Sequence, residues 1–362
     1  LLQAIDYTSD QRLDCKGRPD RPALYQPAAL GGAPETTGPT TIATIGPATL
    51  VLLDLPRLTT AQDSPLLLVA MAGGNDVWPG GALLRSLDDG ASFDQPLDVF
   101  PPGATLGSTG AALGVVDSRV VDTSSRLTVT LSSGSLASVT RALMFSGANH
   151  FAYGEDGRWE VIAAANCTLI GGNDYVLTDL LRGVAGTEWA MGLHVDGDRL
   201  VALNTDDLAS LPMETAALNQ ARLYRAVTFG LDVSTGILRT QTWRGVQFKP
   251  LSPCSLTGDR DTATGDWLLY WVRRTRMGSA WNDYVDAQLG ESVESYWVEI
   301  YQDWTYAVVL RTIVSSSTFA AYTSAQQVAD FGGNQTTLYL RIYQYSTTVG
   351  TGYSLTTEIT RP

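Results

Sequence analysis

The chain has 362 residues, of which 44% are hydrophobic and 17% charged, so it can bury ordinary hydrophobic cores and does not have the composition of a disordered chain. Its 24 basic and 37 acidic residues give a net charge of -13, which argues against a nucleic-acid binder that relies on phosphate contacts. The longest apolar runs fall well short of the ~18 residues that a membrane-spanning helix needs, and no segment resembles a secretory signal.

Residues 1–57 are predicted to form an extended N-terminal connector, because the Pro/Gly/Thr-rich stretch 27–41 is followed by an apolar run that leads into a strand. Residues 58–247 alternate apolar runs with Asp-Gly and Gly-Ser turns, which predicts small β-barrel or sandwich domains with an optional sub-boundary near residue 145. Within this region, the segment 213–227 is expected to be a short helix.

The stretch SLDDGASF at residues 86–93 matches the Asp-box turn found in sialidases and other glycan-active proteins. We expect the carboxylate of Asp88 to accept hydrogen bonds from the turn, Gly90 to take a positive φ, and Phe93 to turn inward as the next strand begins. Ser86 completes the motif. A sialidase would need several such boxes together with an arginine cluster, so a structural turn is the favoured interpretation and no catalytic residue is assigned.

Candidates for metal or imidazole chemistry are few. Cys15, Cys167 and Cys254 lack metal-ligand spacing and are predicted to be reduced, buried side chains, while His150 and His194 sit in apolar surroundings typical of a core edge. The loop 257–266 holds three aspartates, but Ala263 and Tyr270 occupy positions where an EF-hand needs ligands. No metal or cofactor site is therefore predicted. The three aspartates of the loop are Asp259, Asp261 and Asp266. The adjacent pairs Asp88–Asp89 and Asp206–Asp207 are interpreted as solvated loop charges, and not as the paired carboxyl groups of a glycosidase.

Residues 248–362 are the clearest unit. Strand-like runs at 267–272, 295–301, 306–314 and 337–346, separated by Gly/Asp/Ser turns, predict a seven-strand sandwich with Trp271 and Tyr296 in its core. Leu338, Leu340 and Ile342 are expected to point inward on one strand. The Gly-containing turn before the last strand resembles that of a fibronectin type III domain.

Arg273, Arg274 and Arg276 form the densest basic cluster and allow two interpretations. They either contact another subunit or a receptor glycan, or they pair with acidic neighbours such as Asp283 and Asp286, and the second interpretation is favoured. Trp281 belongs to the same candidate contact surface. Together with Trp297 and Trp304 it offers either a sugar-stacking platform or, as the preferred interpretation, core and subunit packing.

Seven phrases in order resemble the C-terminal half of the tail-tip hub proteins of siphophages and gene transfer agents. They are LDLPRL (53–58), WPGGALLRSLDDGASF (78–93), DLLRGVAGTEWA (179–190), WVRRTRMGSAWND (271–283), LGESVESYWVEI (289–300), QQVADFG (326–332) and IYQYSTTVGTG (342–352). The resemblance implies a non-enzymatic virion protein at the tail tip or baseplate, made in the cytoplasm of the bacterial host. It also implies a homotrimer that contacts other tail-tip and tail-tube proteins, with tail fibres or a host surface receptor as further partners.

The predicted fold is therefore all-β, with tandem small barrel or sandwich domains and a C-terminal fibronectin type III-like sandwich. The expected function is that of a structural hub component. Two alternatives remain open at this point. One is a virion protein that binds or cleaves glycans through the Asp-box region and surface aromatic residues, and the other is a surface adhesin built from sandwich domains.

Overall fold

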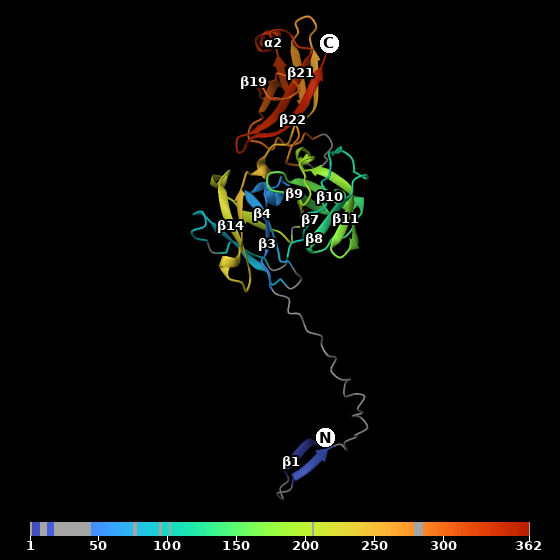
Figure 1. Cartoon of the computed structure of the whole chain (residues 1–362), viewed down its shortest axis with the longest axis vertical. Coiled ribbons are helices and arrows are strands. Elements are labelled where there is room, and N and C mark those ends of the chain that lie inside the picture. Colours follow the sequence, from blue (N-terminus) through green and yellow to red (C-terminus); the bar gives the residue numbers. More distant parts are fainter. Residues whose placement is uncertain are drawn as a thin grey trace. The chain divides into compact units, whose positions relative to one another are not determined.

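The computed structural model describes residues 2–7, 13–17, 45–74, 78–93, 96–100, 103–204, 206–278 and 285–361 (Figure 1). The chain divides into two compact units, Leu1–Thr44 and Ile45–Pro362. In the first unit, β1 (Leu2–Tyr7) pairs antiparallel with β2 (Leu13–Gly17). Two paired strands thus lie within the range 1–57 that was expected to be an extended connector. A third strand in that range, β3, belongs to the second unit.

A three-stranded sheet in the second unit lies between a four-stranded sheet and a barrel. Its strands, in the order β13-β4-β3, are β13 (Ala209–Pro212), β4 (Leu66–Ala72) and β3 (Thr49–Leu53). Leu50 and Leu52 face a four-stranded sheet, whereas Val51 and Leu53 face a barrel. Because successive side chains point to opposite faces, a strand covered on both sides needs apolar residues at every position. This burial explains the unbroken apolar runs of β3 and β4.

The four-stranded sheet shows that the predicted helix at 213–227 is wrong. Its order is β15-β14-β5-β6, with β15 (Ile237–Thr242), β14 (Ala221–Thr228), β5 (Gly81–Ser86) and β6 (Asp98–Phe100). Only Thr215–Ala217 is helical, as a single 3-10 turn. Tyr224 and Ala226 are buried in the core between the two sheets. Their spacing of two residues, stabilised by pairing of β14 with β5 and β15, outweighs the helix-forming residues of the segment.

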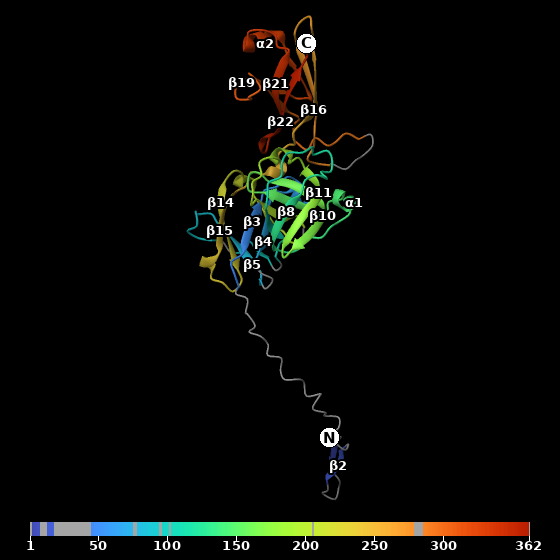
Figure 2. The ribbon, with the colours of Figure 1, turned by 45° about the vertical axis from the view of Figure 1, so that its right-hand side comes forward.

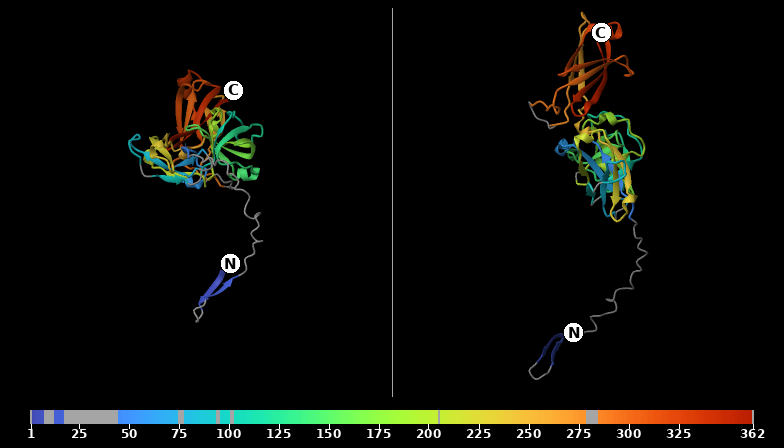
Figure 3. Two further views of the ribbon diagram at one scale, coloured as in Figure 1. Left: turned by 60° about the horizontal axis from the view of Figure 1, so that its bottom comes forward. Right: turned by 90° about the vertical axis from the view of Figure 1, so that its left-hand side faces the viewer.

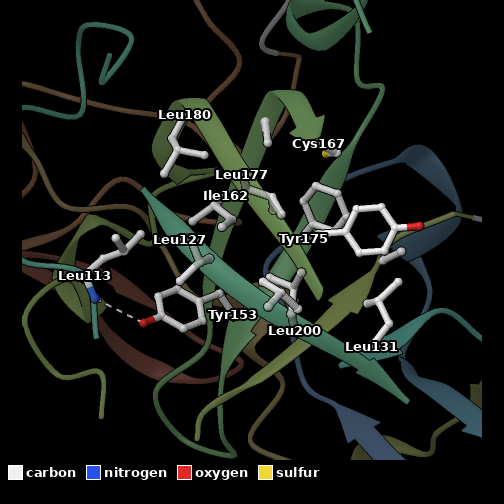
Figure 4. Packing of buried hydrophobic residues seen from close by; sticks show 14 residues of the cluster. Leu113, Leu127, Leu131, Tyr153, Ile162, Cys167, Tyr175, Leu177, Leu180 and Leu200 are labelled. Atoms are coloured by element: carbon white, nitrogen blue, oxygen red, sulfur yellow. Dashed lines mark hydrogen bonds between the residues drawn. The ribbon is translucent and has the colours of Figure 1, made fainter. Parts of the chain in front are cut away.

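Six strands close into a barrel in the order β10-β11-β8-β7-β12-β9, of which β8, β10 and β11 are labelled in Figure 2. They are β7 (Leu106–Thr109), β8 (Leu127–Ser133), β9 (His150–Gly154), β10 (Glu160–Gly171), β11 (Asp174–Val184) and β12 (Arg199–Ala202). Their inward side chains fill the interior, and the hydroxyl of Tyr153 accepts a hydrogen bond from the Leu113 amide at 3.2 Å (Figure 4). The barrel therefore has a packed core.

The C-terminal region forms the predicted sandwich of seven strands, shown from two further sides in Figure 3. Its three-stranded sheet has the order β16-β17-β20, from β16 (Cys254–Arg260), β17 (Trp267–Val272) and β20 (Phe319–Tyr322). Its four-stranded sheet has the order β19-β18-β21-β22, from β19 (Val309–Ser315), β18 (Tyr296–Tyr301), β21 (Thr337–Ser346) and β22 (Gly350–Thr360). The core between the sheets contains all five residues predicted for it, namely Trp271, Tyr296, Leu338, Leu340 and Ile342.

Helices are short in the part of the chain that the structure describes. The α-helices are α1 (Arg141–Phe145) and α2 (Ser324–Phe331), and the 3-10 turns besides Thr215–Ala217 are Thr60–Asp63, Glu188–Ala190, Val233–Thr235 and Val246–Phe248. The sequence analysis missed α2, which Thr323 caps at its start and Gly332 ends with a φ of +79°. Among these residues there is no helix with the length and apolar character to cross a membrane.

Candidate functional site

The SLDDGASF stretch forms a turn that is closed by its own side chains at the end of β5. Asp88 Oδ1 accepts hydrogen bonds from the Ser86 hydroxyl at 2.7 Å and the Ser92 amide at 2.9 Å, and its Oδ2 accepts the Ser92 hydroxyl at 2.6 Å. The Gly90 amide, at a φ of +94°, donates to Ser86 Oγ at 2.7 Å. The hydrogen bond from the Ser92 hydroxyl, with the other donors, lowers the pKa of Asp88 to about 2. The ionised carboxylate is thus held by the turn.

Phe93 lies half-buried just after this turn. The guanidinium carbon of Arg225, on β14, lies 4.0 Å from the centroid of the Phe93 ring, which is a cation–π contact. The next strand, β6, begins only at Asp98. Phe93 therefore anchors the loop against β14 instead of opening the next strand as expected.

The arginine cluster is neutralised within the chain. Each guanidinium forms an ion pair with a glutamate: Arg273 with Glu294, Arg274 with Glu188, and Arg276 with Glu291. These partners differ from the aspartates expected from sequence, of which Asp283 lies outside the described residues together with Trp281. The pair of Arg274 with Glu188 connects the segment that follows β17 to the segment that follows the barrel strand β11. This arrangement gives the cluster a structural use inside the chain.

A buried ionic network in the barrel wall was missed by the sequence analysis. Arg182, on β11, holds the carboxylate of Glu160, on β10, at two points: Nε to Oε1 and Nη2 to Oε2, each at 2.7 Å. His194 Nε2 lies 2.8 Å from Glu160 Oε2. Although burial acts to raise the pKa of Glu160, the hydrogen bonds from His194 and Arg182 hold that pKa below its usual value. The sequence signal that could have revealed this network is the presence of Glu160 and Arg182 within otherwise apolar strands.

The network continues from His194 toward the surface. His194 Nδ1 lies 3.2 Å from Asp198 Oδ2, and Arg158 forms a two-point ion pair with the same carboxylate. The imidazole also stacks on Tyr153, with ring centroids 3.8 Å apart. Since the side chains of Glu160, Arg182 and His194 have no exposed area, no substrate reaches these groups in this structure. The imidazole is a core residue, in agreement with its predicted core-edge setting.

The remaining candidates from the sequence are the aspartates of the loop 257–266, the cysteines and the tryptophans. Asp261 Oδ1 accepts the amides of Ala263 and Thr264, and Asp266 accepts the Ser324 amide at 2.6 Å. Burial raises the pKa of the free Cys167 thiol to about 12. In the described ranges no group of three or more His, Cys, Asp or Glu side chains is arranged to hold a metal ion. Trp297 stacks on Tyr345, and Trp304 is exposed.

A cavity of about 620 Å³ lies where the end of β3, the turn between β9 and β10, and the hairpin of β21 and β22 meet. Trp159, Trp189 and Tyr353 contribute aromatic rings to its wall. Trp189 and Tyr353 stack with centroids 5.0 Å apart and planes inclined by 16°. Lys249 places its Nζ 4.3 Å from the centroid of the Tyr353 ring. We call this space the junction cavity.

Two charged groups in the junction cavity have perturbed pKa values. Burial raises the pKa of Asp54 to about 6, although its oxygens accept the amides of Arg244 at 2.6 Å and Val246 at 2.9 Å. Burial also lowers the pKa of Lys249, against the attraction of Asp54. Among the described residues, Lys249 Nζ has neither a hydrogen bond nor an ion pair. The cavity thus combines aromatic rings with the carboxyl group of Asp54 and the ammonium group of Lys249.

Comparison with known proteins gives one family match. Residues 104–201 match the family described as "Rcc01698-like, C-terminal". The matched stretch begins just before β7 and ends within β12, so it coincides with the barrel and covers less than a third of the chain. A search of curated proteins finds no match.

Proposed function

We propose that the chain is a structural component of the tail tip or baseplate hub of a phage or phage-like particle. In this role it helps to close the tail tube and to organise host-attachment parts. The observation that carries the non-enzymatic part of the proposal is the buried network around Glu160, because these charged residues are paired inside the barrel wall with no exposed side-chain area. The resemblance of seven ordered phrases to tail-tip hub proteins supports the choice of assembly, and the all-β tandem architecture is compatible with it.

The packing of the three-stranded sheet against its two neighbours in the second unit supports a structural role. Val51, Leu53 and Leu55 share one apolar cluster with Trp159 and Val161 of the barrel. The opposite face of the same sheet is covered by the four-stranded sheet. Separating these layers would expose apolar area at a cost of about 25 cal/mol per Å². Because this cost opposes separation, we expect the layers to behave as one rigid body, which suits a structural subunit of a particle.

The proposal assigns no catalytic activity to the chain. The Asp-box carboxylate of Asp88 is held by Ser86 and Ser92, and a glycosidase needs two carboxyl groups that face each other across a sugar. We expect no turnover of sialosides or of peptidoglycan by the purified chain. Turnover that disappears in Asp88→Ala or Asp206→Ala would show that a glycan-cleaving function is the better description.

We further propose a homotrimer that contacts other tail-tip and tail-tube proteins. Large apolar side chains are exposed on the barrel, and they include Phe145 of α1 and Leu169 and Ile170 at the tip of β10. Exposed apolar groups of this kind favour protein–protein contact. Tail fibres or a host receptor are the further partners in this proposal.

Localisation in intact particles tests the proposed function. Antibody fragments against the C-terminal sandwich, imaged by electron microscopy on intact particles, are expected to mark one site at the distal end of the tail. Labelling elsewhere on the particle contradicts the proposal, and so does the absence of any label on particles with intact tails. Native mass spectrometry of the full chain separately tests the trimer, and a monomer at micromolar concentration would contradict self-association.

A further inference from the structure

We propose that the junction cavity is a binding site for a neutral saccharide, with Trp159, Trp189 and Tyr353 as the apolar wall and Asp54 and Lys249 as the polar contacts. This site is distinct from the Asp-box turn and from the exposed Trp304. It does not depend on the proposed role in a tail tip, because it is argued from the cavity itself.

The volume and wall of the cavity suit a sugar. About 620 Å³ lies within the range of small-molecule sites, which combine apolar and aromatic walls with a few polar groups that fix the ligand. A sugar ring has apolar C–H faces that pack on aromatic rings and a rim of hydroxyl groups. Trp159 is largely buried, so its ring forms a fixed part of this wall.

The polar groups match hydroxyls in particular. A hydroxyl donates one hydrogen bond and accepts others, so neighbouring hydroxyls can donate to a carboxylate and accept from an ammonium group at the same time. Asp54 supplies the acceptor and Lys249 the donor in one cavity. The ammonium of Lys249 is held over Tyr353 with no carboxylate within ion-pair distance among the described residues. It is therefore available to a ligand oxygen.

The charges around the cavity favour neither an anionic nor a cationic ligand. Asp156 and Arg244 also line it and form an ion pair at 3.1 Å, so the remaining charges are one carboxyl and one ammonium. An anionic ligand would be attracted by Lys249 and Arg244 but repelled by Asp54 and Asp156, and a cationic ligand would meet the reverse. A neutral ligand can use the carboxyl and ammonium groups as hydrogen-bond partners without either repulsion.

The sequence offers an internal reporter for this site. The chain contains two lysines, Lys16 and Lys249, whereas its other basic residues are arginines. An amine-reactive reagent followed by peptide mass spectrometry thus reports on the cavity through Lys249, with Lys16 as the reference in the same molecule. Since the labelled fraction follows the unoccupied fraction, a saccharide at about ten times its Kd should lower Lys249 labelling about tenfold.

The experiment uses the full chain and defined probes. The neutral probes are maltohexaose, cellohexaose and chitohexaose, and the charged probes are sialyllactose and a glucosamine hexamer, each at millimolar concentration. We expect at least one neutral probe to protect Lys249, to leave Lys16 unchanged and to shift tryptophan fluorescence. Protection by none of the neutral probes, or by the charged probes alone, overturns the proposal.

Two substitutions decide whether the cavity is the site. Lys249→Gln shortens the side chain and removes the ammonium, so binding measured by calorimetry should weaken about tenfold or more. Trp189→Phe shortens the aromatic wall and should weaken it as well. The matched control is Arg119→Gln, because Arg119 is an exposed cation paired with Asp117. Equal affinity in the control and both cavity variants, with unchanged circular dichroism, would place any binding elsewhere and refute the proposal.

Discussion

Arg182 and Glu160 form a two-point ion pair in the barrel wall, with Nε to Oε1 and Nη2 to Oε2 both at 2.7 Å and no exposed side-chain area on either residue. The Gly183 amide donates a further hydrogen bond of 2.9 Å to the same carboxylate. A buried pair adds little net stability over apolar residues of the same shape, but removing one partner leaves an unpaired buried charge. The consequence is a barrel that depends on keeping both residues.

Arg182→Met should therefore be strongly destabilising. We expect a loss of about 3–5 kcal/mol in the free energy of unfolding, because Glu160 keeps its charge without its main partner. Urea denaturation followed by tryptophan fluorescence measures the loss. The matched control is Arg119→Met, which removes an exposed pair and should cost less than about 1 kcal/mol. Similar losses in the two variants would contradict the importance of the buried pair.

Asp54 should make stability fall as pH rises. Burial raises its pKa from 3.8 in the unfolded chain to about 6, so the folded chain binds more protons between these values. The stability that Asp54 contributes is complete below about pH 4 and lost by about pH 6, with a total of about 3 kcal/mol by linkage. The measurement is the difference in unfolding free energy between the natural chain and Asp54→Asn at several pH values. A difference that does not change between pH 4 and pH 7 would disagree with the burial of this carboxyl group.

Asp88→Ala should loosen the Asp-box turn without unfolding the domain. Its carboxylate accepts the Ser92 amide, so hydrogen–deuterium exchange at Ser92 should become faster when the acceptor is lost. The lowered pKa of Asp88, about 2, means that in the natural chain this protection persists down to about pH 2. Asp89→Asn is the control. The carboxyl group of Asp89 is exposed, and an asparagine tolerates the φ of +54° at this position. Faster exchange in both variants would point to a general loss of loop structure.

The ion pair between Arg274 and Glu188 should couple the C-terminal sandwich to the barrel region. Reversal of one charge, in Arg274→Glu, places two carboxylates together and should increase cleavage by a protease between the two regions. The double reversal with Glu188→Arg should restore resistance, since the pair is re-formed with opposite polarity. Limited proteolysis followed by mass spectrometry measures the effect. Failure of the double variant to recover would indicate that the contact depends on Arg274 for another reason.

The sequence determined much of the fold class, because strand alternation is a local property. The period-two pattern of β21 correctly placed Leu338, Leu340 and Ile342 in the core, and Trp271 and Tyr296 were found there as well. At 213–227 the helix-forming residues led to the prediction of a helix, whereas residues 221–228 form the strand β14 and pair with β5 and β15. Pairing with distant strands decides such segments, and a single sequence window does not contain it.

The sequence by itself therefore determined an all-β chain, the composition of its C-terminal core and the residues of the Asp-box turn, since each depends on neighbours within a few positions. Only the tertiary structure decided which charges meet. Glu160, Arg182 and His194 come from separate segments, and the junction cavity combines Asp54 with Lys249 and Tyr353 from nearly 200 and 300 residues further along the chain. Such groups interact through distance, burial and the lowered dielectric around them, which the closing of the barrel and the packing of the sandwich create.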